Sequence, residues 1–319
     1  SGGEACTIAV RIARAASGRD KIAFCGYHGW HDWYLSSNLS NPNNLNKQLL
    51  SGLDTNGVPK SLIDTALPFN YNDIKSFNKI IDNNKNEIGV IIMEPQRGVP
   101  PQNGFLESIR KKADEIGAVL IFDEVTSGFH NNLGGLHLTL GVEPDLAVFA
   151  KALGNGFPIA AIIGKRKIMD VAQDTFISST TWTEANGFAA GLATINKMEK
   201  YKVQETNVLF GKKIKNGWLK VFDELNMNVT VGGLDSIPSF AFNNDHNLLA
   251  TYFAQEMLAN GYLTSTKTSI TFAYSNEIIN NYLEQLNLVF NKVKTSNAKE
   301  VEALLYGPVK HSGFQRLTG

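Results

Sequence analysis

Two apolar runs in the middle of the chain each end in a side chain that can do chemistry. Asp123 follows the run 120–122, and Lys151 follows the run 146–150. A desolvated lysine amine attacks carbonyl groups, and a carboxylate can keep a pyridine nitrogen protonated. This pair therefore fits Schiff-base chemistry. Taken singly, a lysine after a strand is usually a solvated surface residue, and an aspartate there is usually a turn residue or a cap.

The elements that would position these two residues follow from the pattern of the first two thirds of the chain. Short apolar runs alternate with amphipathic stretches, which predicts an α/β fold around a mostly parallel sheet. We predict strands at 21–25, 89–94, 118–123, 146–150 and 159–164, with a crossover helix at 104–116. Ligands of open α/β sheets bind beyond the carboxyl ends of strands, so we expect Asp123 and Lys151 to converge there.

The last third of the chain has a different rhythm. A long helical pattern begins near Gly187 and changes character near Val208. Beyond it, we predict strands at 227–231, 239–242 and 269–273 and helices at 248–259 and 277–293, which make a small α+β domain. The expected domains are therefore 1–205 and 206–319.

The chain opens with Ser1-Gly2-Gly3-Glu4-Ala5 ahead of a helical pattern, and free amides at a helix N-terminus suit a phosphate group. The alternative is that Gly2 and Gly3 only form a tight turn. A second loop, residues 26–32, carries Tyr27 and His28, and an aromatic face there could stack on a flat ring. A metal site at His28, His31 and Asp32 lacks a further ligand cluster, so we predict packing and hydrogen bonding instead, with no metal.

Composition narrows the class of protein. The 319 residues include 30 Lys and Arg against 30 Asp and Glu, without the basic stretches of a nucleic-acid binder. The longest apolar stretches have the length of strands and are too short to span a bilayer. The two cysteines, Cys6 and Cys25, fit buried thiols in a reducing cytoplasm. We therefore expect a cytoplasmic protein that binds small molecules and neither nucleic acid nor membranes.

Six segments together resemble the class III pyridoxal-phosphate-dependent aminotransferases, particularly the branch similar to glutamate-1-semialdehyde 2,1-aminomutase. They occur in the order of that family, from Ser1 to the C-terminal end: SGGEA, GYHGWHD, IIMEP, LIFDEVTSGF, GVEPDLAVFAKALGNGFP and PVKHSGFQRLT. The resemblance implies the type I fold of pyridoxal-phosphate enzymes with a smaller C-terminal domain. It also implies pyridoxal 5'-phosphate as cofactor and a homodimer.

The resemblance assigns roles to individual residues. Lys151 would form the Schiff base with the cofactor and move the proton at the substrate carbon, and Asp123 would pair with the pyridinium nitrogen. Val125 would pack on one face of the cofactor ring and Tyr27 on the other. The Gly2 and Gly3 amides would hold the cofactor phosphate, and Thr180 would reach the phosphate in the neighbouring subunit. Thr181 is an alternative to Thr180, and Glu94 is expected to support the site.

The leading hypothesis is ping-pong transamination between an amino donor and a carbonyl substrate. Aminomutases usually have a Gly- and Asn-containing stretch and a Gly-Phe-Arg where this chain has Gln96-Arg97-Gly98 and Gly128-Phe129-His130. An aminomutase that returns the amino group to the same molecule is the alternative. The family's N-terminal segment has no counterpart before Ser1, which implies an N-terminally truncated member, and an inactive truncated homologue is the third possibility.

Overall fold

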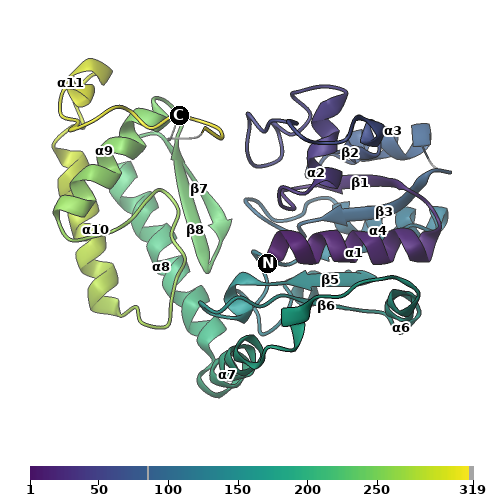
Figure 1. Ribbon diagram of the computed structural model, residues 1–319. Helices are drawn as coiled ribbons and strands as arrows, with labels where there is room; N and C mark the ends of the chain where they lie inside the picture. Colours follow the sequence, from purple (N-terminus) through teal and green to yellow (C-terminus); the bar gives the residue numbers. More distant parts are fainter. Residues whose placement is uncertain (85, 316–319) are drawn as a thin grey trace. The chain divides into compact units, whose positions relative to one another are not determined.

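The computed structural model describes residues 1–84 and 86–315, so the end of the segment PVKHSGFQRLT lies outside the described residues. The chain forms two compact units: Ser1–Lys200 together with the segment from Gly313, and Tyr201–Ser312. The first unit is an α/β layer structure, and the second contains helices and a small sheet (Figure 1). The domains expected at 1–205 and 206–319 stay a prediction.

The first unit is built on a six-stranded sheet in the order β2-β1-β3-β4-β5-β6. Every pairing from β2 to β5 is parallel, and β6 runs antiparallel to β5. The α/β fold with a mostly parallel sheet is therefore confirmed. The strands are β1 (Lys21–Cys25), β2 (Ala66–Pro68), β3 (Ile88–Met93), β4 (Val119–Asp123), β5 (Leu146–Phe149) and β6 (Ala161–Gly164).

Both faces of this sheet are covered, which is why the central strands are apolar throughout. On one face, α1 (Gly2–Ser17) packs its small residues Ala5, Ala9 and Ala13 against alternate strand residues. On the other face, α3 (Ile74–Asn84) and α4 (Phe105–Ile116) cover the intervening residues. The helix α1 ends at Gly18, whose φ of 66° is the left-handed conformation of a helix C-cap. The N-terminus of α1 lies at the carboxyl edge of the sheet (Figure 1).

Shorter elements connect these layers. The short helices are α2 (Asp32–Leu35), α5 (His137–Leu140) and α6 (Arg166–Met169), and α7 (Ala185–Tyr201) is the long helix near the end of the first unit. Single turns of 3₁₀ helix lie at Ser36–Leu39, Lys60–Leu62, Lys151–Leu153, Asp170–Asp174 and Thr180–Thr183.

The second unit has a core of its own, with Trp218, Phe240 and Phe290 at its centre. It consists of α8 (Val203–Glu224), β7 (Val229–Leu234), β8 (Ile237–Phe242), α9 (His246–Ala259), α10 (Asn276–Asn291) and α11 (Ala298–Glu302). The predicted strand at 269–273 is wrong. Ile270 is buried and its amide donates to the Ser236 carbonyl oxygen at 2.9 Å, but residues 269–273 form no strand, and the isolated bridge with Ser239 lies before them at Lys267.

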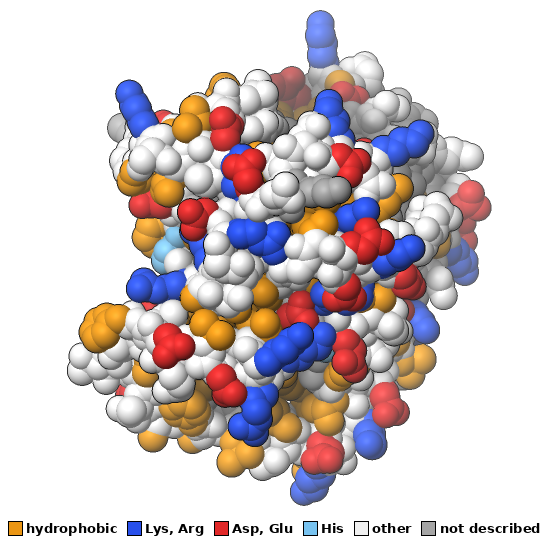
Figure 2. Space-filling view, turned by 90° about the vertical axis from the view of Figure 1, so that its right-hand side faces the viewer, with side chains coloured by type: hydrophobic (Ala, Val, Ile, Leu, Met, Phe, Trp, Pro, Cys, Tyr) orange, Lys and Arg blue, Asp and Glu red, His pale blue; other side chains and the backbone are white. Residues whose placement is uncertain are grey.

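The surface carries charges of both signs. On the face shown in Figure 2, Lys and Arg side chains are interspersed with Asp and Glu, in line with the equal numbers of basic and acidic residues. Within the part of the chain that the structure describes, no helix combines the length and the apolar character that a bilayer span requires.

Candidate active site

Asp123 and Lys151 lie at the carboxyl ends of two neighbouring parallel strands. Asp123 is the last residue of β4, and Lys151 comes two residues after the end of β5. Both line one cavity of about 580 Å³. Tyr27, Val125, Gly2 and Gly3 line the same cavity. The structure thus brings together six of the seven residues that the sequence singled out, and Thr180 is the exception.

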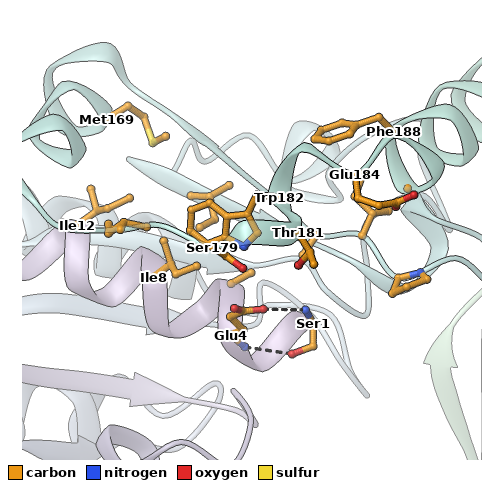
Figure 3. Close-up of a pocket in the computed structure, with 17 residues that line it drawn as sticks. Ser1, Glu4, Ile8, Ile12, Met169, Ser179, Thr181, Trp182, Glu184 and Phe188 are labelled. Atoms are coloured by element: carbon orange, nitrogen blue, oxygen red, sulfur yellow. Dashed lines mark hydrogen bonds and ion pairs between the residues drawn. The ribbon is translucent and has the colours of Figure 1, made fainter.

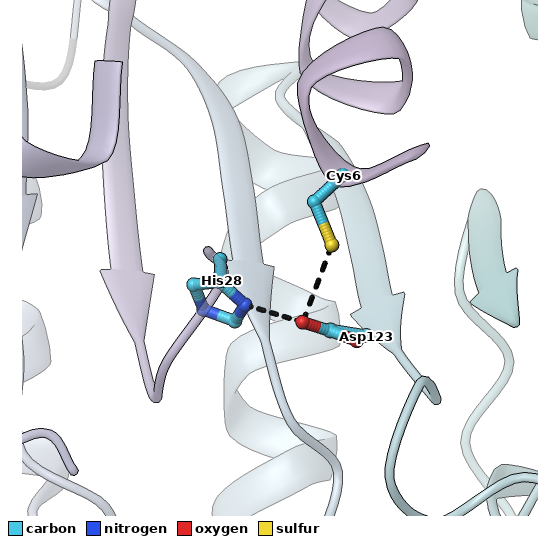
Figure 4. Close-up of side chains that lie close together, drawn as sticks. All are labelled: Cys6, His28 and Asp123. Carbon is cyan, nitrogen blue, oxygen red and sulfur yellow. Dashed lines mark hydrogen bonds and ion pairs between the residues drawn. The ribbon is translucent and has the colours of Figure 1, made fainter. Parts of the chain in front are cut away.

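The Asp123 carboxylate is buried and accepts three hydrogen bonds, two of which, with His28 and Cys6, are drawn in Figure 4. Its Oδ2 atom lies 2.7 Å from His28 Nδ1 and 3.3 Å from Cys6 Sγ, and its Oδ1 atom accepts from the Val125 amide at 3.0 Å. Burial alone would raise the pKa of Asp123, but the hydrogen bond and charge of His28, aided by the Val125 amide, lower it below its ordinary value. Asp123 is therefore an ionised carboxylate.

Cys6 acts as a donor to this carboxylate. Burial, followed by the Asp123 charge, raises the pKa of the Cys6 thiol well above its usual range, so the sulfur keeps its proton. The three ligand-type atoms of Cys6, His28 and Asp123 lie within 4.8 Å of one another. Cys6 and His28 both bond to Asp123 Oδ2. We therefore interpret these three residues as a charged acid with its two hydrogen-bond donors.

Lys151 is oriented by the turn that follows Asp123. Its Nζ atom donates to Thr126 Oγ1 at 2.7 Å, and its own backbone has a φ of 43°, the left-handed region that non-glycine residues seldom adopt. The desolvation expected for this amine is not found, because the Lys151 side chain is exposed in this chain. The hydrogen bond to Thr126, rather than burial, directs the amine toward the turn after Asp123.

This turn is itself held by a buried acid. The Glu124 carboxylate accepts from the His137 amide at 2.9 Å and contacts His137 Nδ1 at 2.8 Å, and it also accepts a short hydrogen bond from Ser127. Val125 and Thr126 lie between these anchored positions. Their side chains are consequently fixed on the cavity side of β4.

The N-terminus of α1 approaches the cavity closely because its first residues are glycines. A Cβ atom on Gly2 would lie 2.7 Å from Val125 Cγ1, and one on Gly3 would lie 3.3 Å from the Gly29 Cα. Backbone amides at the positive end of a 16-residue helix favour an anion at this point. With an ionised acid, an amine, Tyr27 and Val125, the lining fits a flat pyridine ring that carries an aldehyde and a phosphate.

A second cavity, of about 610 Å³, lies along the N-terminal half of α1 (Figure 3). It shares Ser1, Pro158 and Ile159 with the first cavity, and Trp182 and Phe188 give it an aromatic wall. Thr181 lines this cavity, whereas the exposed Thr180 belongs to neither lining within the described residues. The choice between the two threonines stays a prediction.

Sequence reasoning missed two residues of this site, Cys6 and Thr126. The hydrogen bonding expected for His28 is found, but its partner Asp123 lies 95 residues away, and Cys6 reaches the same carboxylate across 117 residues. Thr126 carried a weak signal, since it follows Asp123 within the same turn. None of these contacts could be read from local periodicity.

Comparison with known proteins identifies relatives. A family model described as aminotransferase class-III matches residues 1–292. The 3-aminobutyryl-CoA aminotransferase of Cloacimonas acidaminovorans (strain Evry) is 34% identical over 307 residues, which is 90% of this chain and 70% of that protein. The glutamate-1-semialdehyde 2,1-aminomutase of Methanosphaera stadtmanae is 36% identical over 258 residues, which is 77% of this chain and 58% of that protein.

Solved structures share the fold. The FumI protein of Sphingopyxis sp. MTA144, solved in its PLP internal aldimine form, has a TM-score of 0.81 at 24% identity. The match covers 92% of this chain and 69% of that one. A structure described as a transaminase with PLP bound also has a TM-score of 0.81 at 24% identity, and the match covers 92% of this chain and 72% of that one.

Proposed function

This chain belongs to the class III aminotransferase family of pyridoxal-phosphate-dependent enzymes, and we propose that it transfers an amino group between an amino donor and a carbonyl substrate at the cavity that contains Lys151. The observation that carries this proposal is the presence of the Lys151 amine and the ionised Asp123 carboxylate in one cavity. When bound there, pyridoxal phosphate supplies an aldehyde carbon that accepts amines and a ring that withdraws electrons.

Lys151 has two tasks in this proposal. Its amine would hold the aldehyde carbon of the cofactor in the resting enzyme, and as a free amine it would move a proton at the substrate carbon. Thr126 Oγ1, 2.7 Å from Lys151 Nζ, gives the displaced amine a defined resting position. This hydrogen bond would keep the amine in the cavity while it is not bonded to the cofactor.

Asp123 and the cavity walls have the binding tasks. The Asp123 carboxylate, held ionised by its donors, keeps a pyridine nitrogen protonated, which strengthens the ring as an electron acceptor. Tyr27 and Val125, which line the same cavity, would cover the faces of the ring and keep water from them, and the Gly2 and Gly3 amides would hold the phosphate.

The oligomeric state and location are part of the same proposal. Thr180 is exposed and lies outside the lining of its own chain's cavity, which leaves it accessible to a second copy of the chain. We therefore propose a homodimer with Thr180 at the shared boundary. A cytoplasmic location is supported by Cys6 and Cys25, which are both buried and unpaired as thiols.

Borohydride reduction tests the assignment of Lys151. The protein loaded with pyridoxal phosphate is expected to absorb in the visible range and to lose that absorption on reduction. The reduced cofactor is then expected to remain covalently attached to the peptide that contains Lys151. The Lys151→Ala variant is the matched control, because it keeps the cavity but offers no amine. Absence of a covalent adduct on Lys151 in the wild-type protein would contradict the proposal.

Isomerisation is the second candidate function, favoured by the 36% identity to an aminomutase. An aminomutase returns the amino group to a neighbouring carbon of the same molecule and needs no separate donor. Product analysis with glutamate-1-semialdehyde as sole substrate separates the two reactions. Turnover without an external amino donor supports isomerisation, whereas strict dependence on a donor excludes it.

A further inference from the structure

The backbone of Tyr27 is held by three side chains from distant parts of the chain, which we call the Tyr27 clamp: Gln48, Glu94 and Arg97. Gln48 Oε1 accepts from the Gly26 amide at 2.7 Å, and Glu94 Oε2 accepts from the Tyr27 amide at 3.3 Å. Arg97 joins the two acceptors. It forms an ion pair with Glu94 and donates from Nη1 to the Gln48 carbonyl oxygen at 3.3 Å.

The clamp is a closed cycle of contacts. From Gly26 it runs to the Gln48 side chain, from the Gln48 backbone carbonyl oxygen to Arg97, then to Glu94 and back to the Tyr27 amide. Gln48 is further tied by its Nε2 atom, which donates to the Phe69 carbonyl oxygen at 3.2 Å. Such a linked set limits the movement of residues 26 and 27 more than separate hydrogen bonds would, because its members support one another.

Gly26 is adapted to this arrangement. Its φ is 117°, and a Cβ atom there would lie 2.5 Å from Glu94 Oε2. The carboxylate therefore occupies the space that a side chain at position 26 would need. The Tyr34 hydroxyl completes the support by donating to the Gly26 carbonyl oxygen at 3.0 Å.

The buried Glu94 carboxylate of the clamp is paired with the charge of Arg97. Glu94 is 5% exposed, and burial raises its pKa, with the Arg97 charge acting in the opposite direction. A buried carboxylate that loses its cation partner is strongly destabilised, because the remaining charge is unpaired. Arg97, whose side chain is about a quarter exposed, is thus the cation partner that stabilises the Glu94 carboxylate beside the Tyr27 amide.

We propose that Gln48 and Arg97 are positioning residues of the active site, which act through Gly26 and Glu94 to hold the Tyr27 ring as a wall of the cavity. The cofactor-facing role of Tyr27 rests on the proposed function, whereas the restraint of its backbone does not. Neither Gln48 nor Arg97 lines the cavity, so each acts without touching the bound ring.

Amide hydrogen exchange in the cofactor-free protein tests the restraint. Arg97→Met and Gln48→Met are each expected to speed exchange at Gly26 and Tyr27 by about tenfold, the effect of losing one buried hydrogen bond. The matched control is Arg110→Met, which removes a similar arginine from the Asp145 carboxylate at the amino end of β5. Unchanged exchange in both clamp variants, or equal acceleration in the control, overturns the proposal.

Cofactor binding tests the consequence for the site. Arg97→Met is expected to weaken pyridoxal phosphate binding by about tenfold and to change the visible circular dichroism of the bound cofactor. Arg97→Lys, which keeps the charge, is expected to restore part of the affinity and the spectrum. In a Tyr27→Leu background the Arg97→Met effect is expected to vanish, because the wall it positions is absent. Independent, multiplying effects of the two substitutions overturn the proposal.

The two experiments separate this inference from the proposed function. If the protein binds no pyridoxal phosphate, the proposed function fails, while the amide exchange still decides whether the clamp restrains residues 26 and 27. If exchange accelerates as expected and cofactor affinity does not change, the clamp restrains the backbone without positioning the ring, and the proposal is overturned in its second step.

Discussion

Asp123 illustrates how single hydrogen bonds decide the chemistry of this cavity. A carboxyl group that is 3% exposed would be neutral in apolar surroundings, and a neutral acid cannot keep a pyridine nitrogen charged. His28 Nδ1 at 2.7 Å, the Cys6 thiol and the Val125 amide together outweigh burial and hold the pKa of Asp123 below its ordinary value. The acid is therefore prepared before any ligand arrives.

The first prediction concerns the charge of Asp123. Asp123→Asn keeps the shape of the side chain and removes its charge, so the amino-transfer rate is expected to fall by about 10²–10³-fold, the effect of losing one preorganised electrostatic contact. Steady-state kinetics of the loaded protein measure this. The control is Asp54→Asn, a substitution in an exposed carboxylate outside the cavity lining, which is expected to leave the rate unchanged. A rate within threefold of wild type for Asp123→Asn would refute the assigned role.

The same residue predicts a pH dependence of stability. The pKa of Asp123 is lower in the folded protein than its ordinary value of 3.8, so the folded state binds the proton less readily than the unfolded state. The stabilisation is fully present above pH 3.8 and is lost as the pH falls through the folded pKa. Denaturant titrations at several pH values are expected to show the wild type losing free energy of unfolding relative to Asp123→Asn only below about pH 4. A constant difference down to pH 2 would contradict this sign.

At the next scale, the loop after β1 meets the first turn of α1 through two glycines. A Cβ atom on Gly29 would lie 2.8 Å from the Gly3 Cα, which is closer than real Cβ contacts occur. The φ of Gly29 is 107°, so a side chain there would also be strained. The elements that carry Tyr27 and the proposed phosphate amides are therefore joined at a point where only glycine fits.

The second prediction is that Gly29→Ala damages both the fold and the site. We expect a loss of about 1–3 kcal/mol in the free energy of unfolding from the strained backbone, with an additional loss from the contact with Gly3. Gly57→Ala is the matched control, because Gly57 has a similar φ of 85° but open space around it. Urea unfolding measures stability, and titration with pyridoxal phosphate measures affinity. Equal effects of the two substitutions would show that the close contact is unimportant.

For the whole molecule, the division into two compact units has a consequence for stability. The cavity with Lys151 is lined only by residues of the first unit, while the second unit has its own aromatic core around Trp218, Phe240 and Phe290. A ligand stabilises the structure to which it binds, by about 2.7 kcal/mol at a hundredfold excess over its Kd. Binding in the cavity should therefore stabilise the two units unequally.

The third prediction uses tryptophan fluorescence as a separate probe of each unit. Of the four tryptophans, Trp33 is buried in the first unit and Trp218 in the second. Two variants, each with one of these tryptophans and phenylalanine at the other three positions, therefore report the unfolding of each unit separately. Added pyridoxal phosphate is expected to raise the urea midpoint reported by Trp33 and to leave that reported by Trp218 nearly unchanged. The variant that reports Trp218 is the internal control. Coincident midpoints that move together would mean that the chain unfolds as one cooperative unit.

The sequence alone was sufficient to predict the alternation of strands and helices, the mostly parallel sheet and the family to which the chain belongs. Apolar periodicity is a local property, and each central strand of the first unit is buried on both faces, so its residues carry an uninterrupted signal. The same reasoning placed Asp123 and Lys151 at strand ends. We could expect Asp123 and Lys151 to converge because the carboxyl ends of parallel strands lie at the same edge of a sheet. The pattern at 269–273 gave a wrong prediction, because Ile270 is buried without belonging to a hydrogen-bonded strand.

Only the tertiary structure decided which side chains meet. Strand order puts β3 between β1 and β4, and this order brings His28 and Cys6 to Asp123 and brings Arg97 to Gln48. These contacts join residues 49 to 117 positions apart, and no periodic signal encodes pairs at such separations. The ionisation of Asp123 and the support of Tyr27 depend on them. They arise from the packing of the sheet, since hydrogen bonding and burial are properties of the assembled surroundings rather than of a segment.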